Sequence, residues 1–358
     1  MSGCAASLSK AGVVKRWEYH NIHVLLAPVY LQMVGWCLRF GVTPMGIFKA
    51  NYGLDHGGAT FASKFAIQMS FPQDAFPPTS LVAGDGERSQ RLAQITDFAR
   101  AHSYPVVLKP DQGRIGYGVT LLHDDQDAQR FVDEIAADYL LQAHAPGPLE
   151  FGVFYVRQRG EPRIFAINSK EFPAVTGTGE HRVAELIDLD ARLALFKSLF
   201  NQQRFDEVPA AGESVVLSSV GSHTLGCVFR DVTHLRTREM LAAVHAAVGI
   251  DGFNYGRLDA RTGSIEALQR GEFEVIEVNG VESLATNAFD PDFSYRQGLR
   301  WFRDQYRLLI AIAAEHKSVE MDLLGYREFF KRVAHAEDSI ARLGSLVHFA
   351  PAAQKNRP

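Results

Sequence analysis

The sequence predicts an α/β protein, in the broad sense that includes α+β, with two or three domains. Two observations support this fold class. Apolar runs rich in Val, Ile and Leu alternate along the chain with segments whose apolar residues recur at helical spacing. The chain has 358 residues, 46% hydrophobic and 22% charged, which is ordinary for a soluble globular protein with a large core.

The N-terminal part, from Trp17 to about Ala83, is expected to form a first α/β unit. Residues 28–40 are predicted to be helical. Residues 48–64 are interpreted as a strand end, a glycine turn and a helix start, and the proline-marked stretch 76–86 as a connector with a short strand.

Residues 22–38 contain no Asp, Glu, Lys or Arg and could be mistaken for a membrane element. The run is short against the roughly 20 apolar residues that a span needs, and Pro28 interrupts it. We therefore expect a buried helix of the first domain. A membrane-associated or signal-like segment is the alternative.

Beyond residue 86, strands and helices follow in alternation. Helices are predicted at 88–102, 127–138, 191–203, 237–248, 296–315 and 326–343. Strands are predicted at 105–109, 119–122, 139–143, 150–157, 163–169, 214–217, 225–229, 255–259 and 272–277. Two antiparallel pairs are expected, 150–157 with 163–169 and 255–259 with 272–277.

Charge and cysteine content exclude several classes. The net charge of -4, without a Lys/Arg cluster, gives no case for nucleic-acid binding. Cys4, Cys37 and Cys227 are far apart and odd in number, so neither a disulfide framework nor a zinc site is expected, and a cytoplasmic location fits.

The stretch PVVLKPDQGRIGYGV, residues 105–119, is the most informative part of the chain. An apolar strand ends in Lys109, and a loop with Gly113, Gly116 and Gly118 follows. Glycines let backbone N–H groups approach phosphate oxygens, which a Cβ would obstruct. The order predicts a strand that brings a cation to a nucleotide phosphate and a flexible lid that closes over it. An ordinary hairpin loop after a solvated lysine is the alternative.

With GRLDAR at 256–261 and FEVIEVNGVES at 273–283, the chain resembles the ATP-grasp superfamily, specifically carboxylate–amine ligases such as D-alanine–D-alanine ligase. The resemblance covers about residues 50–305. It implies two α/β subdomains that clasp ATP behind a smaller N-terminal domain. The implied ranges are 1–95 for the N-terminal domain, 96–149 for the lid subdomain, 150–315 for the subdomain with the metal site, and 316–358 for a helical extension and tail.

The resemblance also implies nucleotide contacts. Lys109 and Lys64 would reach the ATP phosphates, and the three glycines would form the phosphate lid. LLQAHAPGPLEFGVFYV resembles the adenine hinge, in which Glu150 would accept two hydrogen bonds from the ribose hydroxyls. Gln142 stands where relatives often have an acid and could accept from the adenine amino group.

Arg257 and Asp259 lie two apart on one predicted strand, and Glu277 and Asn279 two apart on another. Each pair therefore shares a face, and antiparallel pairing would bring the two faces together. Asp259, Glu277 and Asn279 make an all-oxygen set that suits Mg²⁺, for which Mn²⁺ can substitute. Arg257 would neutralise the transferring phosphate. A surface salt-bridged hairpin is the alternative.

Weaker candidates follow from the same resemblance. Lys170 would point into the ATP site. TGTGEHRVAELI resembles a turn of cyanophycin synthetase, but Thr178 stands where that family has an aspartate. SVGSHTLGCVFRDVT resembles a segment that lines the acceptor side, with His223, Arg230 and Asp231 as candidates.

The function that the resemblance implies is ATP-dependent ligation of a small carboxylate to an amine through an acyl phosphate, on amino-acid-like or small peptide substrates. A phosphotransferase or a non-ligase nucleotide-binding protein is the alternative, and a membrane-associated binding protein built on residues 22–38 is a third. No nucleic-acid partner and no membrane contact are expected. The oligomeric state stays open, a homodimer included.

Overall fold

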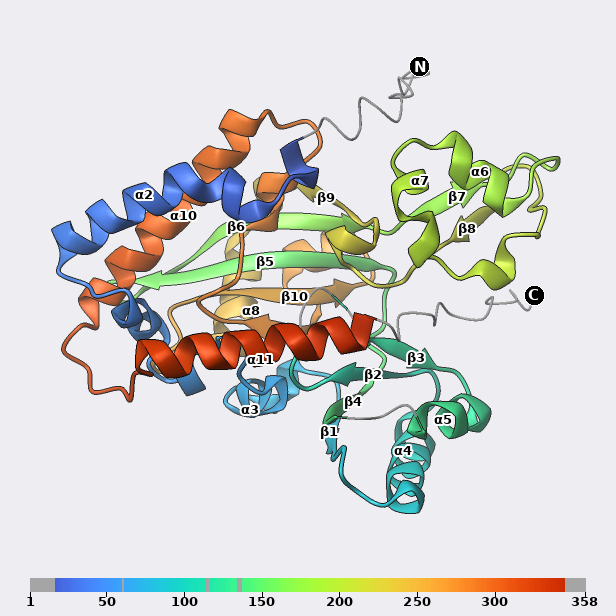
Figure 1. Ribbon diagram of the computed structural model, residues 1–358, viewed down its shortest axis with the longest axis horizontal. Coiled ribbons are helices and arrows are strands. Elements are labelled where there is room, and N and C mark those ends of the chain that lie inside the picture. The colour runs from blue at the N-terminus through green and yellow to red at the C-terminus, as the bar shows by residue number, and fades with distance from the viewer. Residues whose placement is uncertain (1–16, 60, 114–115, 117, 134–136, 345–358) are drawn as a thin grey trace.

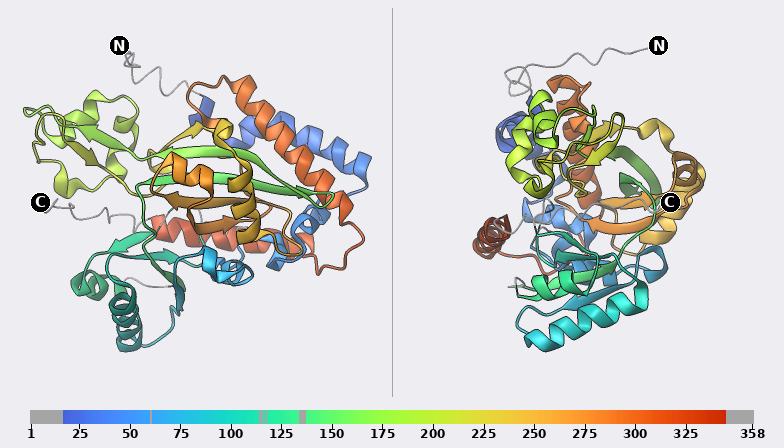
Figure 2. Two further views of the ribbon diagram at one scale, coloured as in Figure 1. Left: turned by 180° about the vertical axis from the view of Figure 1, so that it is seen from behind. Right: turned by 90° about the vertical axis from the view of Figure 1, so that its right-hand side faces the viewer.

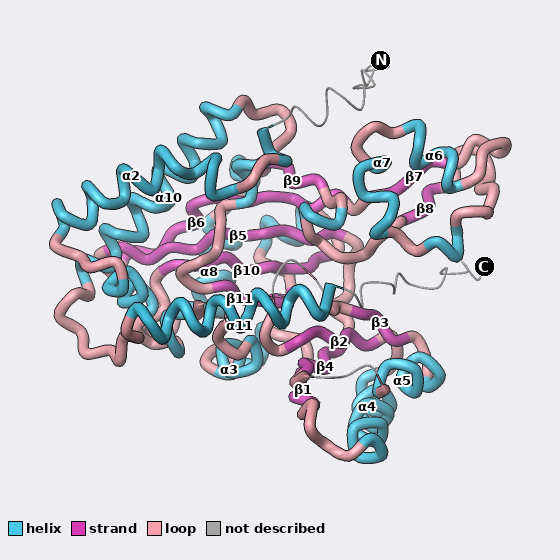
Figure 3. The backbone as a smooth tube through the Cα atoms, viewed as in Figure 1, coloured by secondary structure: helices cyan, strands magenta, loops and turns pink. Residues whose placement is uncertain are grey.

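The computed structural model describes residues 17–59, 61–113, 116, 118–133 and 137–344 (Figure 1). Two larger antiparallel sheets and one small two-stranded sheet organise this part of the chain. Figure 3 shows the strands in the interior and the helices on the outside. The mixed helix and sheet fold class that the sequence predicts is confirmed.

The four-stranded sheet has the order β1-β4-β2-β3. Its strands are β1 (Thr79–Val82), β2 (Val106–Pro110), β3 (Thr120–Leu122) and β4 (Tyr139–Ala143). Helices α4 (Arg88–His102) and α5 (Asp125–Val132) cover one face. Ile95 and Ala128 pack there against Val106, Leu108 and Leu141. Lys109 therefore lies near the end of a strand whose other side chains hold it in a rigid sheet.

The five-stranded sheet has the order β11-β10-β5-β6-β9. Its strands are β5 (Leu149–Gln158), β6 (Glu161–Glu171), β9 (Val228–Asp231), β10 (Tyr255–Thr262) and β11 (Glu274–Asn279). Both predicted hairpin pairings are present, β5 with β6 and β10 with β11. Helices α8 (Arg238–Val248) and α9 (Ile265–Arg270) cover the face seen from behind in Figure 2. Part of the other face packs on α10 (Tyr295–Glu315).

A small separate core lies around the two-stranded sheet of β7 (Ala174–Thr176) and β8 (Ser214–Val216), with α6 (Val183–Leu189) and α7 (Leu193–Phe196). The helix predicted at 191–203 is wrong, because α7 ends at Phe196 and two 3₁₀ turns follow. Asn201 explains the break: its side chain accepts a hydrogen bond from the N–H of Gln203 (2.9 Å) and starts a new turn.

Between Trp17 and Pro78 the described residues contain helices and no strand. They are the 3₁₀ turn Trp17–Tyr19, α2 (Ile22–Phe40), the 3₁₀ helices Met45–Asn51, Asp55–Gly57 and Gln73–Ala75, and α3 (Lys64–Met69). The strand end expected near residue 48 is thus a 3₁₀ helix. Because β1 pairs with β4, we propose that the lid subdomain begins near Thr79 rather than at residue 96.

The expectation that α2 is a buried helix is wrong. Only Leu26 and Val29 are buried, where they pack with Phe302 of α10. Four large apolar side chains on the other side of α2 are exposed: Val24, Leu31, Val34 and Leu38. By length and composition α2 is the one helix of the described residues that could cross a membrane.

The last helix, α11 (Tyr326–Gly344), lies in front of β10 and β11 in Figure 1. Phe329 contacts the rings of Phe48 and Phe61, and Arg332 lies over the ring of Phe61. Residue 61 is three positions before Lys64, so α11 supports the loop that leads into α3.

Candidate active site

One row of directly paired residues crosses the five-stranded sheet. Glu277 lies opposite Asp259, Asp259 opposite Gly152, Gly152 opposite Asn168, and Asn168 opposite Asp231. Directly paired residues project to the same face of a sheet. The predicted meeting of Asp259 and Glu277 is therefore a property of the strand register.

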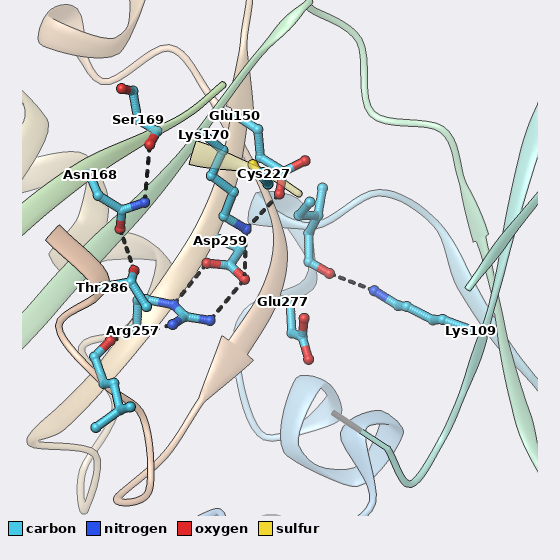
Figure 4. Close-up of polar contacts among 12 residues, drawn as sticks. Lys109, Glu150, Asn168, Ser169, Lys170, Cys227, Arg257, Asp259, Glu277 and Thr286 are labelled. Carbon is cyan, nitrogen blue, oxygen red and sulfur yellow. Dashed lines mark hydrogen bonds and ion pairs between the residues drawn. The ribbon is translucent and has the colours of Figure 1, made fainter. Parts of the chain in front are cut away.

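On this face a lysine joins two carboxylates (Figure 4). Lys170 Nζ lies 2.6 Å from Glu150 Oε1 and 3.1 Å from Asp259 Oδ2. Arg257 donates from Nε to Asp259 Oδ1 (2.9 Å) and from Nη2 to Oδ2 (3.2 Å). The lysine and both carboxylates are buried, which is tolerated because each charge has an opposite partner.

Burial and pairing act in opposite directions on these groups. Burial alone would raise the pKa of Asp259, but Arg257 and Lys170 more than offset it and hold that pKa below its ordinary value. Burial alone would lower the pKa of Lys170, but Asp259 and Glu150 raise it above the ordinary value. Asp259 and Lys170 are therefore both charged at neutral pH.

Two glycines make room for this cluster. A Cβ on Gly152 would lie 2.3 Å from Asn168 Oδ1 and 3.2 Å from Arg257 Cδ. A Cβ on Gly221 would lie 2.5 Å from Glu150 Oε1. Sequence reasoning missed both glycines and Asn168. The glycine within the apolar strand FGVF was the available signal, because an interior strand glycine marks a close approach.

Lys109 reaches across from the four-stranded sheet. Its Nζ donates to the carbonyl of Ile276 on β11 (2.7 Å) and to Gln142 Oε1 (3.1 Å). Burial lowers the pKa of Lys109 to about 8, although Glu277 opposes the shift. The two sheets thus meet at this lysine, and its contact with a nucleotide phosphate stays a prediction.

Gln142 lies on β4, an inner strand of the four-stranded sheet, and is buried. Its side-chain oxygen accepts from Lys109, and its Nε2 donates to Thr79 Oγ1 (3.0 Å). The amide therefore orients Lys109, and the expected contact of Gln142 with an adenine amino group stays a prediction.

Lys64 is the first residue of α3, and Asp111 fixes its place. Asp111 Oδ1 accepts from Ser63 Oγ (3.0 Å) and from the N–H of Phe65 (2.9 Å). Lys64 Nζ donates to the carbonyl of Gly113 and lies 4.0 Å from Glu277 Oε1. Burial lowers its pKa. Asp111 was missed because its partners are almost 50 residues away in sequence.

The glycine loop follows directly. Gly116 and Gly118 have φ values of 80° and 72°, which side chains rarely adopt. A Cβ on Gly116 would lie 2.3 Å from Val220 Cγ1, so the loop contacts the segment that also packs on Glu150. Residues 114, 115 and 117 of the predicted lid lie outside the described residues.

The contacts of Asp259, Glu277 and Asn279 show whether these three side chains could hold Mg²⁺. Among the described residues no three His, Cys, Asp or Glu side chains form a group that could hold a metal ion. Asp259 is paired with Arg257 and Lys170. Asn279 Nδ2, however, is buried without a hydrogen-bond partner. Exchanging the two amide positions would present an oxygen there. Two carboxylates and one amide oxygen fit a hard cation.

The acceptor-side candidates make contacts of their own. The ring of His223 lies among Tyr19, Phe229 and Phe289, with Nε2 4.0 Å from Glu18. The roles of His223, Arg230 and Asp231 on the acceptor side remain predictions.

Arg230 and Asp231 differ in their side-chain contacts, although the N–H of Asp231 also donates to Asp290 (2.7 Å). Arg230 Nη1 lies 3.0 Å from Asp292 Oδ2 and 3.7 Å from Asp290 Oδ1. Asp231 instead accepts from Thr233 Oγ1 (2.5 Å). As neighbours on β9 the two project to opposite faces, and only Asp231 shares the face of Asp259.

Charged side chains from both larger sheets lie where the two sheets meet. No family model and no curated protein matches the chain.

Among solved structures, the chain is similar to a D-alanyl-alanine synthetase A from Vibrio cholerae (10% identity, TM-score 0.38, 71% of this chain and 65% of that one). It is also similar to a D-alanine–D-alanine ligase from Bacillus anthracis (12%, 0.37, 73% and 64%) and to a bifunctional glutathione synthetase from Pasteurella multocida (17%, 0.35, 65% and 34%). The matches span less than two thirds of each of these three chains.

Proposed function

We propose that the protein is an ATP-dependent carboxylate–amine ligase that acts on small, amino-acid-like or peptide substrates. One observation carries this proposal. Four cationic side chains and three carboxylates converge where the two sheets meet: Lys64, Lys109, Lys170, Arg257, Glu150, Asp259 and Glu277. Lys109, Lys170, Glu150 and Asp259 are buried, and so many buried charges are expensive for a purely structural role.

The cations enter from both sides of the site. Lys109 comes from the four-stranded sheet and Lys64 from the start of α3, whereas Arg257 and Lys170 come from the five-stranded sheet. A triphosphate between them would find positive charge on each side, which lowers the cost of negative charge that develops during phosphoryl transfer. Glu150, neutralised by Lys170, would still accept from ribose hydroxyls.

Asp259, Glu277 and Asn279 would hold Mg²⁺, which supplies neutralisation of the phosphate oxygens when bound. A carboxylate oxygen of the first substrate attacks the γ-phosphorus and ADP departs, which leaves an acyl phosphate. The amine nitrogen then attacks the acyl carbon, loses a proton, and inorganic phosphate leaves. Arg257 would stabilise the phosphoryl group, and the glycine loop would exclude water.

The test is ADP release across amino acids and dipeptides, offered singly and in pairs. Ligation requires release that depends on both an acid and an amine, with an amide product of matching mass. Release with one substrate alone, together with a phosphorylated product, would indicate a phosphotransferase. ATP binding without substrate-dependent release in any pair would contradict ligase activity.

We predict that ATP slows amide hydrogen exchange in the glycine loop. Gly116 and Gly118 hold backbone conformations without side-chain restraint, and phosphate oxygens would accept from their N–H groups. Exchange is followed by mass spectrometry with and without Mg·ATP, with α8 as an internal reference that should not change. Equal exchange of the loop in both states would show that it is not a phosphate lid.

We also predict that ATP affinity falls as pH rises above 8. The pKa of Lys109 is lowered from 10.5 to about 8, so the free protein loses this charge above that pH. The dissociation constant for ATP should then rise up to about tenfold per pH unit. Lys109→Ala should weaken binding by about 1.5–3 kcal/mol at neutral pH.

Titration calorimetry between pH 7 and 9.5 measures this effect, with limits chosen about 1 to 1.5 units either side of the pKa. Lys109→Arg keeps its charge over the whole range and should flatten the profile. Lys49→Arg, at a lysine that donates to the carbonyl of Lys317 instead, should keep the wild-type profile. A wild-type profile in Lys109→Arg would show that another group titrates.

A further inference from the structure

Helix α2 has the composition of a buried helix in a place where only one side is covered. Its exposed apolar side chains recur at spacings of three and four, at Val24, Ala27, Leu31, Val34 and Leu38. Such a spacing gives one continuous stripe along the helix. Leu31 and Leu38 are 77% and 79% exposed, so the fold itself does not use this stripe.

Four arginines lie on the helix beside the stripe. Helix α10, which runs alongside α2 in Figures 1 and 2, carries Arg296, Arg300, Arg303 and Arg307 at spacings of four, three and four. All four are exposed and share one face of α10. That face adjoins the one with Leu299 and Phe302, which packs against α2.

The ends of α2 add to this charge. Arg39 is exposed in its last turn, and the amine of Lys317 lies 3.9 Å from the Cβ position of Gly41, directly after the helix. The sequence contains no Asp or Glu from residue 19 to residue 54. Near the arginine face, Asp304 lies 2.8 Å from Arg303 Nη2. The surface around the apolar stripe is thus predominantly positive.

We propose that α2 and the arginine face of α10 form a docking surface for a membrane with anionic lipids. The apolar stripe would lie among the acyl chains near the headgroups, and the arginines would contact lipid phosphates. This reverses the expectation that the protein makes no membrane contact. It is independent of the proposed ligase activity, because no residue of the candidate site is involved.

A second copy of the chain fits this surface less well. A 19-residue helix is about 28 Å long and about 10 Å wide, so two α2 helices would bury roughly 300 Å² per partner. Stable interfaces bury about 800 Å² per partner. Pairing would also bring the two arginine faces towards each other, which like charges oppose.

The contacts of α2 favour a helix that lies on the bilayer over one that crosses it. The hydroxyl of Tyr295 donates to the carbonyl of Leu25 (2.8 Å), and Tyr30 contacts the ring of Tyr306. Leu26 and Val29 are buried against α10. A spanning α2 would have to give up all of these contacts, whereas an interfacial one keeps them.

The experiment is co-sedimentation of the full chain with vesicles of phosphatidylcholine, alone or mixed with phosphatidylglycerol. We expect binding to the mixed vesicles that weakens with salt. Leu31→Glu should abolish it, because the glutamate would have to enter the apolar layer. Val216→Glu, at an exposed valine on β8, is the matched control and should bind as the wild type does. Replacing Arg300 and Arg307 with Gln should weaken binding about fivefold per arginine.

Two experimental results would overturn the proposal. One is the absence of vesicle binding at low salt by a folded wild-type chain. The other is equal binding by Leu31→Glu and the wild type. Light scattering without vesicles tests the second copy: a dimer that Leu31→Glu dissociates would assign the stripe to self-association and also overturn the membrane proposal.

Discussion

Replacing Glu277 with Gln is expected to reduce ligase turnover at least about 100-fold while the fold persists. The change keeps the side-chain shape and removes one negative charge. Glu277 lies opposite Asp259 in the register of β10 and β11, and its Oε1 is 4.0 Å from Lys64 Nζ. In the proposed mechanism it would join the metal ion to the lysines that would face the phosphates.

Turnover is measured as substrate-dependent ADP release, and Mn²⁺ binding by electron paramagnetic resonance in the presence of an ATP analogue. Glu272→Gln is the matched control, since the same change falls just before β11 on a residue whose partner is the exposed Arg270 (2.7 Å). Both variants should unfold at similar urea concentrations. Normal turnover or unchanged Mn²⁺ affinity in Glu277→Gln would remove Glu277 from the metal site.

The sequence predicts those features that depend on local pattern. Helix α4 spans Arg88–His102 and β4 spans Tyr139–Ala143, as expected, because each has a clear period and clear boundaries. The pairing of Asp259 with Glu277 was also predictable. Residues two apart on one strand share a face, and directly paired residues of neighbouring strands project to the same face. The apolar residues of both strands indicate which face is buried.

Features that depend on distant partners were not predictable. Gln142 orients Lys109, and nothing within the adenine-hinge segment indicates that contact. Asp111 fixes α3 through Ser63, and Gly221 gives space to Glu150 from 71 positions away. The burial of α2 was predicted wrongly for a related reason. An apolar composition indicates that a helix has surface to bury, but it does not indicate which element packs against that surface.

Replacing Lys170 with Met is expected to lower the free energy of unfolding by about 3–5 kcal/mol. Lys170 is the only described cation between Glu150 Oε1 (2.6 Å) and Asp259 Oδ2 (3.1 Å), and its side chain is 4% exposed. Methionine fills a similar volume, so packing is largely kept. The loss comes from two buried carboxylates that no longer share a counter-ion.

Lys197→Met is the control for the effect of burial. Lys197 Nζ also lies 2.6 Å from a carboxylate, that of Asp188, but both of these side chains are partly exposed. The free energy of unfolding of Lys197→Met should fall by no more than about 1 kcal/mol.

The difference in the free energy of unfolding between the two variants should depend on pH with a defined sign. The pKa of Asp259 is held below 3.8 in the wild type, so the stabilisation is complete at neutral pH and is lost as pH falls through the lowered value. In Lys170→Met, Asp259 loses one of the two cations that lower its pKa and can take up a proton at a higher pH, so the cost of the substitution should be largest near pH 7 and should shrink in acid. Urea denaturation at several pH values tests this. Equal losses in the two lysine variants, or a cost in Lys170→Met that does not change with pH, would mean that the buried charges are not held by mutual pairing.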